Sequence, residues 1–453
     1  MEWLALVLFA LVCLCLLLGY PVALTLAGVS LIFAGIGAGL GVFDASYLRA
    51  MPSRLFGIIS NQSLIAVPLF VLMGVVLEKA RIAEDLLEAM AQLLARFRSG
   101  LAISVVLVGT LLAASTGIVG ATVVTMGLLS LPTMLKRGYA PSLAAGSICA
   151  TGTLGQIIPP SIALVLLGDV LSSAYQKAQL DMGIFSPESV SVGDLFVGAI
   201  IPGLLLVLLY LVYLFILSRV KPNYFPKHGD EVSKLNWQAL ISALLPPLIL
   251  IILVLGSILF GFATPTEAAG VGATGALILC VAKGKMRFSL LQDAAQQTTR
   301  VTSMVFLILI GASLFSLVFR GFGGEALLMD FFAGLPGGVF SAMLLVMLLV
   351  FLLGFILDFI EISFVVVPII APILFVMGVD PIWLGIMLAV NLQTSFLTPP
   401  FGFALFYLRG VASSLVRTSD IYRGVIPFIL IQLLLLALIA IFPALVTWLP
   451  SVL

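Results

Sequence analysis

Charge is scarce in this chain. Of its 453 residues, 9% are charged and 62% are hydrophobic, and the 21 basic and 20 acidic residues give a formal net charge of +1. Soluble globular domains carry about 25% charged residues, so the composition excludes an ordinary soluble fold. The balanced charge also excludes a basic surface for nucleic acid, and no nucleic-acid partner is expected. The chain is predicted to be a polytopic membrane protein that lies in a lipid bilayer.

Residues that usually carry enzyme chemistry are scarce as well. The single histidine, His228, lies in a polar stretch with no acid or nucleophile pattern around it. The four cysteines stand in apolar runs without metal-ligand spacing, and no G-x-x-x-x-G-K-[ST] motif occurs. A membrane-embedded hydrolase or transferase would need a nucleophile with a partner or a metal cluster, so we predict that this protein is not an enzyme. Any uphill work would draw on an ion gradient or on another chain.

The chain does contain an internal repeat. Five residues recur at an offset of 240 positions: Pro132, Gly138, Pro141, Pro159 and Pro160 match Pro372, Gly378, Pro381, Pro399 and Pro400. A chance match in register at five such positions is improbable. Repeated membrane halves with helices broken at corresponding prolines are typical of secondary transporters, whose binding site lies between the repeats.

Charge also predicts how the two halves are oriented. Residues 99–135 carry no charge and lie between Arg98 and Lys136. At about 1.5 Å per residue this stretch is too long for one span and barely long enough for two, so we predict a re-entrant hairpin that opens to the cytoplasm. The 240-residue offset places a second hairpin at 339–375, and the intervening spans predict that it opens to the outside. The repeat is therefore predicted to be inverted.

Hydropathy and charge divide the chain into segments. By residue range these are N-terminal transmembrane scaffold helices (1–78), an amphipathic arm helix (79–98), a first hairpin and broken helix (99–168), an external loop with scaffold helices (169–282), a second amphipathic arm (283–300), a scaffold helix with a connector (301–338), a second hairpin and broken helix (339–411) and a C-terminal transmembrane helix (412–453). The arms alternate apolar and charged residues at the helical period, as interfacial helices do. The two hairpin segments form the predicted transport domain.

The two Pro-Pro pairs predict unwound breaks inside spans, at 151–161 and 391–400. Proline donates no backbone hydrogen bond, and the residue before it avoids helical geometry. The carbonyls left without their helical partners are those of Gly155, Gln156, Ser395 and Phe396. Bare carbonyls are costly in hydrocarbon, so either a cation such as sodium binds them or neighbouring hydroxyls and water repair a simple kink.

The middle of the first hairpin is rich in small and hydroxylated residues. Half-helix ends that meet at Ser115, Thr116 and Gly117 could close the other side of a cation site near Gly155. Close packing of small residues between helices is the alternative interpretation.

The repeat places an acid at the tip of the second hairpin. Residues 355–358 correspond to 115–118, so Asp358 falls at the tip. An ionised acid at the membrane centre costs about 2.5 to 3.5 kcal/mol, and such a residue is functional by default. Glu361, one turn later, either shares a proton with Asp358 or faces an external vestibule.

Two further polar motifs in the sequence call for an interpretation. Thr264, Pro265 and Glu267 have the spacing of a helix capping box, which is a structural role. Arg320 precedes a glycine-rich stretch, and it is either an interfacial arginine that reaches to the membrane surface or a partner for an organic anion at the gate.

These motifs resemble those of a known family. TGTLGQIIPPS, NLQTSFLTPPFG, ATPTEAAGVGA and the two hairpins are similar to the large membrane subunit of tripartite ATP-independent periplasmic (TRAP) transporters, over nearly the whole chain. G-x-x-x-P-P-S followed 240 residues later by T-P-P-x-G is the specific part. The resemblance implies an elevator mechanism and sodium-coupled uptake of organic acid anions across the bacterial inner membrane. It also implies two partners, a separate small four-helix membrane subunit and a soluble periplasmic protein that delivers the substrate.

The resemblance further implies site residues. The sodium ligands would be Ser115, Thr116, Gly117, Gly155, Ile158, Asn391, Thr394, Ser395 and Thr398, and the substrate-side residues would be Asp358, Arg320 and Thr153. No metal beyond sodium is expected. The alternative function is a stand-alone sodium/dicarboxylate symporter of the same elevator type, which needs no binding protein. The acid itself is not specified, because in the resembled family the delivering protein sets much of the selection.

Overall fold

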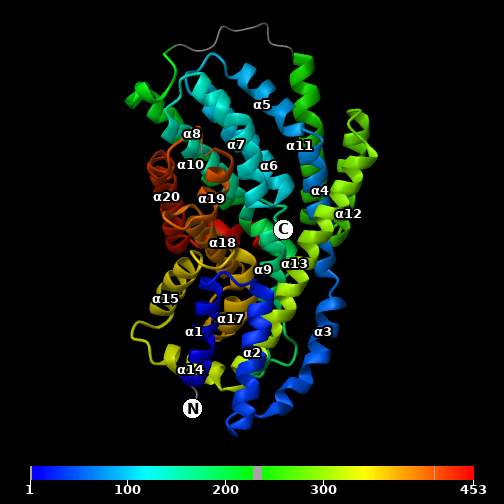
Figure 1. Cartoon of the computed structure of the whole chain (residues 1–453), viewed down its shortest axis with the longest axis vertical. Helices are drawn as coiled ribbons and strands as arrows, with labels where there is room; N and C mark the ends of the chain where they lie inside the picture. The colour runs from blue at the N-terminus through cyan, green and yellow to red at the C-terminus, as the bar shows by residue number, and fades with distance from the viewer. Residues whose placement is uncertain (1–2, 228–236, 413, 453) are drawn as a thin grey trace.

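The computed structural model describes residues 3–227, 237–412 and 414–452 as helices joined by short connections (Figure 1). His228 lies outside the described residues. Within the described ranges there is no β-strand. By length and composition, eight helices there are able to cross a membrane, or up to nine if the bent pair 45–59 and 63–79 is one span. The predicted all-α polytopic membrane fold is confirmed.

The N-terminal part of the chain forms helices α1 to α10. Their bounds are α1 Trp3–Leu17, α2 Val22–Gly39, α3 Met51–Ile59, α4 Ala66–Lys79, α5 Ile82–Leu93, α6 Gly100–Thr116, α7 Val119–Lys136, α8 Pro141–Thr153, α9 Ile162–Asp181 and α10 Val192–Val220. Short 3-10 turns lie at η1 Ala45–Ala50, η2 Ser63–Ile65, η3 Leu154–Gln156 and η4 Pro222–Tyr224. The chain bends by 55° between α3 and α4.

The C-terminal part forms helices α11 to α21. Their bounds are α11 Trp237–Leu259, α12 Pro265–Ala282, α13 Phe288–Gly321, α14 Gly324–Ala333, α15 Gly338–Leu353, α16 Phe359–Glu361, α17 Val367–Val376, α18 Pro381–Leu397, α19 Phe403–Ala412, α20 Thr418–Ile441 and α21 Ala444–Val452. A π-helical turn, η5 Ile362–Val366, joins α16 to α17. The capping box predicted at Thr264 is confirmed at the start of α12: Thr264 accepts from Glu267 N, and Glu267 accepts from Thr264 N.

Residues that are 240 positions apart also share the same backbone conformation. Helices α8 and α18 begin at Pro141 and Pro381, where the fixed φ of proline suits the first helical position and its missing N–H costs nothing. Gly138 and Gly378, just before them, have φ of +86° and +89°, a left-handed conformation that favours glycine. Both Pro-Pro bonds are cis.

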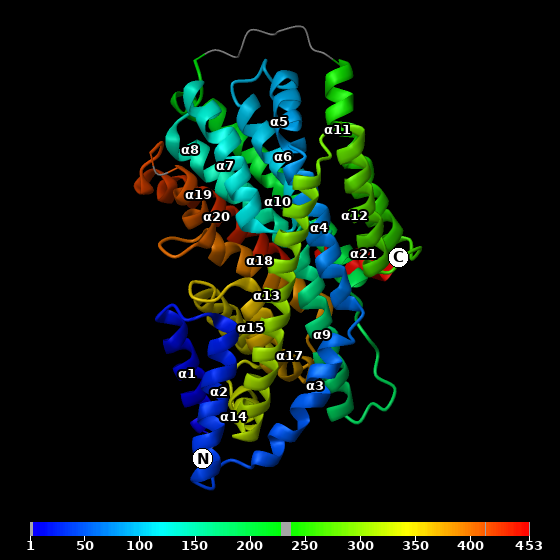
Figure 2. The ribbon, with the colours of Figure 1, turned by 45° about the vertical axis from the view of Figure 1, so that its right-hand side comes forward.

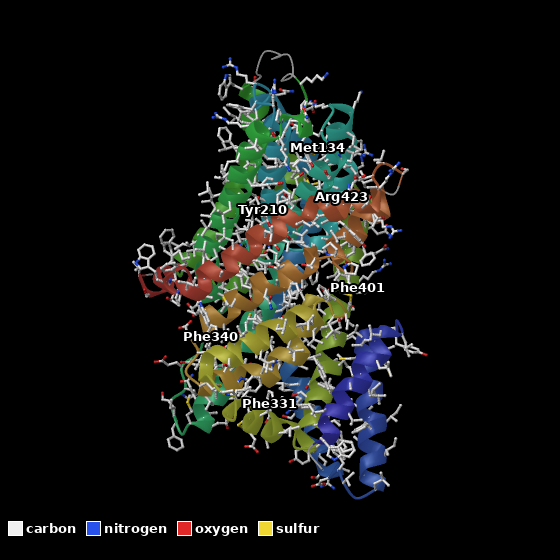
Figure 3. All side chains as sticks on the ribbon, turned by 90° about the vertical axis from the view of Figure 1, so that its left-hand side faces the viewer. Met134, Tyr210, Phe331, Phe340, Phe401 and Arg423 are labelled. Carbon is white, nitrogen blue, oxygen red and sulfur yellow. The ribbon has the colours of Figure 1, made fainter. Side chains whose placement is uncertain are left out.

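The two hairpins occupy different ends of the molecule. Figures 1 and 2 show α5 to α8 in the upper half, and α14, α15 and α17 in the lower half beside α1 and α2. In Figure 3, Met134 of α7 lies above Tyr210, and Phe331 and Phe340 lie in the lower half. The long helix α13 runs between the two ends and packs on α2 and α4. Helices α8 and α18, which precede the Pro-Pro pairs in the chain, both pack against α20 between the ends.

Two helices run past the segment boundaries drawn from the sequence, and one expected helix is divided in two. Helix α13 continues through residues 300 and 301, because residues 288–310 contain neither proline nor glycine to end it. Helix α9 continues past Asp169, whose carboxylate accepts a hydrogen bond from Asn61 (2.8 Å). The single helix expected at 412–453 is instead two, α20 and α21, separated at Phe442 and Pro443.

Candidate functional site

The tip of the first hairpin lies between α6 and α7. Helix α6 ends at Thr116, and Gly117 turns the chain with a φ of +61°. The hydroxyls of Ser115 and Thr116 donate to Leu112 O at 2.9 and 3.0 Å, and the Thr116 hydroxyl also lies 2.8 Å from that of Thr122. Each hydroxyl has one proton and two lone pairs, so both remain able to bind a cation.

The first Pro-Pro pair leaves an irregular stretch between η3 and α9. Ser161 Oγ lies 2.8 Å from Gly155 O and 3.0 Å from Gln156 O. A neighbouring hydroxyl therefore reaches both carbonyls, which is the alternative left open for a break of this kind. That hydroxyl has one proton for two carbonyls, so spare lone pairs remain on both. Ile158 is half-buried, and its side chain packs near Gly203 of α10.

The first hairpin tip and the first break lie against each other. A Cβ placed on Gly155 would lie 3.3 Å from Ala113 O of α6. A Cβ on Gly74 of α4 would lie 2.6 Å from Thr116 Cα, so only glycine allows α4 to approach the tip this closely. The structure brings together the predicted sodium ligands Ser115, Thr116, Gly117 and Gly155.

The second break is shorter than predicted. Helix α18 continues to Leu397, so the unwound stretch expected at 391–400 begins only at Thr398, whose backbone is extended (φ −87°, ψ 123°) as is usual before proline. Thr398 N donates to Ser395 O (3.1 Å), so the prediction that this carbonyl is free is wrong. The reason is that the prolines remove only their own N–H groups, while residues up to Thr398 keep theirs.

The predicted ligands of the second half are buried or half-buried and hydrogen-bonded within their surroundings. Thr394, Ser395 and Thr398 each donate a hydroxyl to a carbonyl three or four residues earlier, at 2.7 to 2.8 Å. Asn391 donates to Met347 O of α15 at 2.8 Å, which ties the second hairpin to α18. As in the first half, the oxygen atoms keep unused lone pairs.

The second hairpin tip meets the last turn of α18, just before the second break. Gly354, at the end of α15, lies directly on Ser395 Oγ, with no room for a Cβ between them. By the 240-residue offset, Ser395 corresponds to Gly155, and Gly354 corresponds to Ala114, the neighbour of Ala113. The same tip-to-break contact therefore occurs twice.

Asp358 and Glu361 form a capping box at the second tip. Phe359 N donates to Asp358 Oδ1 (2.6 Å), and Asp358 N donates to Glu361 Oε2 (2.8 Å). Glu361 uses one carboxylate oxygen in this contact. The π-helical turn η5 follows directly, and such turns are frequent at functional sites.

Thr153 lies in a buried polar cluster rather than among the contacts of the hairpin tips. Gln432 Nε2 of α20 donates to Tyr210 OH (2.8 Å) and to Thr153 Oγ1 (3.3 Å). Gln393 of α18, which corresponds to Thr153 at the 240-residue offset, lies close enough to Tyr210 to interact with its hydroxyl. Thr153 contacts Gln432 and Gln393 lies beside Tyr210, so the two equivalent positions meet the same Gln432–Tyr210 pair, and Tyr210 is labelled in Figure 3.

Arg320 is paired at the far end of α13. Its Nη2 lies 2.9 Å from Glu325 Oε1, and Lys177 Nζ lies 2.7 Å from the same oxygen. Among the described residues, no contact joins Arg320 to Asp358. The two predicted substrate-side residues are therefore in different surroundings.

Two acids at interhelical contacts were missed by sequence reasoning. Asp169 of α9 accepts from Asn61, and Glu78 of α4 accepts from Thr125 of α7 (3.1 Å). Each acid lies at the edge of an apolar run of the sequence. That position could have identified both acids as candidate functional residues. No group of three or more His, Cys, Asp or Glu side chains in the described ranges is arranged to hold a metal ion.

Comparison with solved structures places the fold among transporters. The transporter YdaH of Alcanivorax borkumensis matches 96% of this chain and 99% of its own, with a TM-score of 0.63 and 15% identity. The efflux pump MtrF of Neisseria gonorrhoeae matches 87% of this chain and 83% of its own, with a TM-score of 0.61 and 14% identity. At these identities the likeness concerns the fold alone.

Comparison with protein sequences is more specific. The C4-dicarboxylate TRAP transporter large permease protein DctM of Pseudomonas aeruginosa is 30% identical over 411 residues, which is 90% of this chain and 91% of that protein. The sialic acid TRAP transporter large permease protein SiaM of Vibrio cholerae is 28% identical over 96% of this chain and 95% of its own. The family model of the tripartite ATP-independent periplasmic transporter, DctM component, matches residues 9–445. The chain therefore belongs to this family as a large permease subunit, a multi-pass protein of the inner membrane.

Proposed function

We propose that this chain is the permease of a sodium-coupled, binding-protein-dependent importer of small organic acid anions, and that it works by an elevator movement. The names of its relatives support the substrate class, since C4-dicarboxylates and sialic acid are both carboxylates. The partners would be a small four-helix membrane subunit and a soluble periplasmic protein that binds the substrate. The protein would transport its substrate without changing it chemically.

The contact between a hairpin tip and a helix break, found once in each half, carries the proposal. At each contact, buried hydroxyl and carbonyl oxygens gather beside the end of a broken helix, and they retain lone pairs. In membrane transporters, neutral oxygen atoms at the breaks of helices coordinate sodium ions. The predicted ligands Ser115, Thr116 and Gly155 would hold one ion, and Ser395 and Thr398 would contribute to a second.

Reconstitution of the three components tests this function. Proteoliposomes that contain this chain and the small subunit would receive the binding protein, loaded with the acid that co-purifies with it. An inward sodium gradient is expected to drive concentrative uptake, and an equal potassium gradient is not. Uptake that ignores the sodium gradient would contradict sodium coupling. Robust sodium-driven uptake by this chain alone would identify a stand-alone symporter instead.

A further inference from the structure

A groove lies where the arm helix α5 meets α11 and the C-terminal end of α12. Its volume is about 570 Å³, which is large enough for a small organic molecule. Figures 1 and 2 show α5 and the start of α11 together at the upper end of the molecule. By the predicted topology this end faces the cytoplasm, because Lys283 and Lys285 are expected on the inner side of the membrane.

The groove is lined by two acids and two lysines. Lys283 Nζ lies 2.7 Å from Asp85 Oδ2, and this ion pair joins α12 to the arm. Glu88 and Lys285 are exposed, and neither forms an ion pair or a side-chain hydrogen bond within the part of the chain that the structure describes. The groove therefore offers a ligand one carboxylate and one ammonium group, and its four charges sum to zero.

This balance of charge fits a zwitterion better than an anion. An anion drawn to Lys285 would also be repelled by Glu88, whereas a zwitterion can satisfy both. A primary ammonium has three N–H donors for carboxylate oxygens. A quaternary ammonium has none and is bound over aromatic rings, and no aromatic residue is among the described residues that line the groove. A phosphate with a primary amine, as in phosphoethanolamine, therefore matches the groove.

The groove borders a surface that suits acyl chains. Ile241, Leu245 and Ile249 recur every four residues along α11, and all three are exposed. They precede or follow Ser242 and Pro246, which line the groove, by one to three residues. Successive residues of a helix are about 100° apart, so the apolar stripe lies on the face next to the groove. A headgroup in the groove would leave its acyl chains against this stripe.

We propose that the groove binds the headgroup of phosphatidylethanolamine from the cytoplasmic leaflet, with the ammonium at Glu88 and the phosphate at Lys285. The bound lipid joins the arm, which leads into the first hairpin, to α11 and α12. This inference depends neither on the transported substrate nor on sodium coupling. A groove that is merely a solvated gap between helices would show no preference among headgroups.

Lipid binding to the purified, delipidated full chain tests the proposal without any need for transport. Phosphatidylethanolamine, phosphatidylcholine and phosphatidylglycerol with identical acyl chains would be added in detergent, and bound lipid would be measured by native mass spectrometry. Phosphatidylethanolamine is expected to bind at least about fivefold more tightly than the other two. Equal binding of the three lipids would overturn the proposal. Equally tight binding of glycerophosphoethanolamine, which lacks acyl chains, would overturn the assignment to a lipid.

Two variants with matched controls locate the site. Glu88→Gln is expected to abolish the preference for phosphatidylethanolamine over phosphatidylcholine, and Glu84→Gln, one turn earlier on α5 and outside this groove, is expected to keep it. Lys285→Gln is expected to weaken phosphatidylethanolamine binding at least fivefold, and Lys221→Gln, in another segment predicted to be internal, is expected to leave it unchanged. Both substituted groove residues are exposed, so the variants should fold. An unchanged preference in Glu88→Gln, or equal losses in a variant and its control, would overturn the proposal.

Discussion

At the scale of single residues, the acids of the second hairpin tip accept hydrogen bonds from backbone N–H groups. Asp358 caps α16, and Glu361 returns the bond to Asp358 N. A cap satisfies the N–H groups at a helix start, but asparagine and serine do this as well as aspartate and carry no charge. The cap therefore explains the shape of the tip and does not explain why a charged residue stands in the membrane.

Asp358→Asn separates the two roles. Asparagine keeps the cap, so the melting temperature is expected to stay near that of wild type. Loss of the charge is expected to reduce uptake at least about tenfold, equivalent to about 1.4 kcal/mol in the coupled step. Uptake by the three-component system and the melting temperature are measured on the same preparation.

A capping box elsewhere provides the control for this variant. Thr264→Ala removes an equivalent cap at α12, which is expected to cost about 0.5 to 2 kcal/mol of stability with uptake retained. A folded Asp358→Asn variant with full uptake would show that the carboxylate has no part in transport.

Thr398→Val tests the second predicted sodium site. The substitution keeps the shape of the side chain and removes a hydroxyl that donates to Thr394 O at 2.7 Å. We expect a stability loss of about 0.5 to 1.5 kcal/mol and a rise in the half-saturating sodium concentration that exceeds any rise for the substrate. Thr447→Val removes a hydroxyl with the same spacing on α21 and should leave sodium dependence unchanged. An unchanged sodium dependence in Thr398→Val would remove this residue from the site.

At the scale of elements, each hairpin is held against a broken helix by small residues at the contact. The second hairpin reaches α18 at Gly354, where the approach to Ser395 Oγ leaves no room for a side chain. The backbone of Gly354 has ordinary helical angles, so the glycine is needed for space and not for conformation. The close packing at Gly354 and the contact with the Ser395 hydroxyl oxygen are therefore one and the same interaction.

Gly354→Ala is expected to disturb this contact. A methyl group would displace the Ser395 hydroxyl and break its bond to Leu392 O, at a cost of about 1 to 3 kcal/mol. Uptake should fall with it. Gly28→Ala in α2 is the matched control, because open space surrounds that position and alanine is the better helix former. A Gly354→Ala variant as stable and active as wild type would argue against a functional contact.

At the scale of the whole molecule, an elevator movement requires the hairpin segments to slide along the segments predicted as scaffold. Helix α4 belongs to predicted scaffold and α7 to the first hairpin, and Glu78 accepts from Thr125 between them at 3.1 Å. By contrast, Thr266 of α12 donates to Gln62 O at 3.0 Å, and both positions lie in predicted scaffold.

Cross-linking compares these two contacts. In a background without the four native cysteines, the pair Glu78→Cys and Thr125→Cys would be joined with a short bifunctional thiol reagent. Uptake is expected to stop and to return when the link is reduced, because the hairpin can no longer slide past α4. The pair Gln62→Cys and Thr266→Cys is expected to tolerate the link, and the single variants show the effect of each substitution alone. Full uptake with the first pair linked would contradict an elevator movement.

The membrane class, the helical fold and the repeat could all be predicted from the amino-acid sequence. Composition is a property of the whole chain, and the proline offset of 240 residues can be read without knowing any contact. The capping box at Thr264 was also predictable, because its partners lie three residues apart.

The contacts of the site residues could not be read from the sequence. The sequence left open whether a cation or a neighbouring hydroxyl meets the carbonyl of Gly155, and the structure places a hydroxyl six residues later within hydrogen-bond distance. The structure pairs Arg320 with Glu325 and places Lys177, 148 residues from Glu325, on the same carboxylate oxygen. Hydropathy and spacing describe which residues share a helix face, but a hydrogen bond needs a donor and an acceptor within about 3 Å. Helix packing alone fixes that distance between residues far apart in the chain.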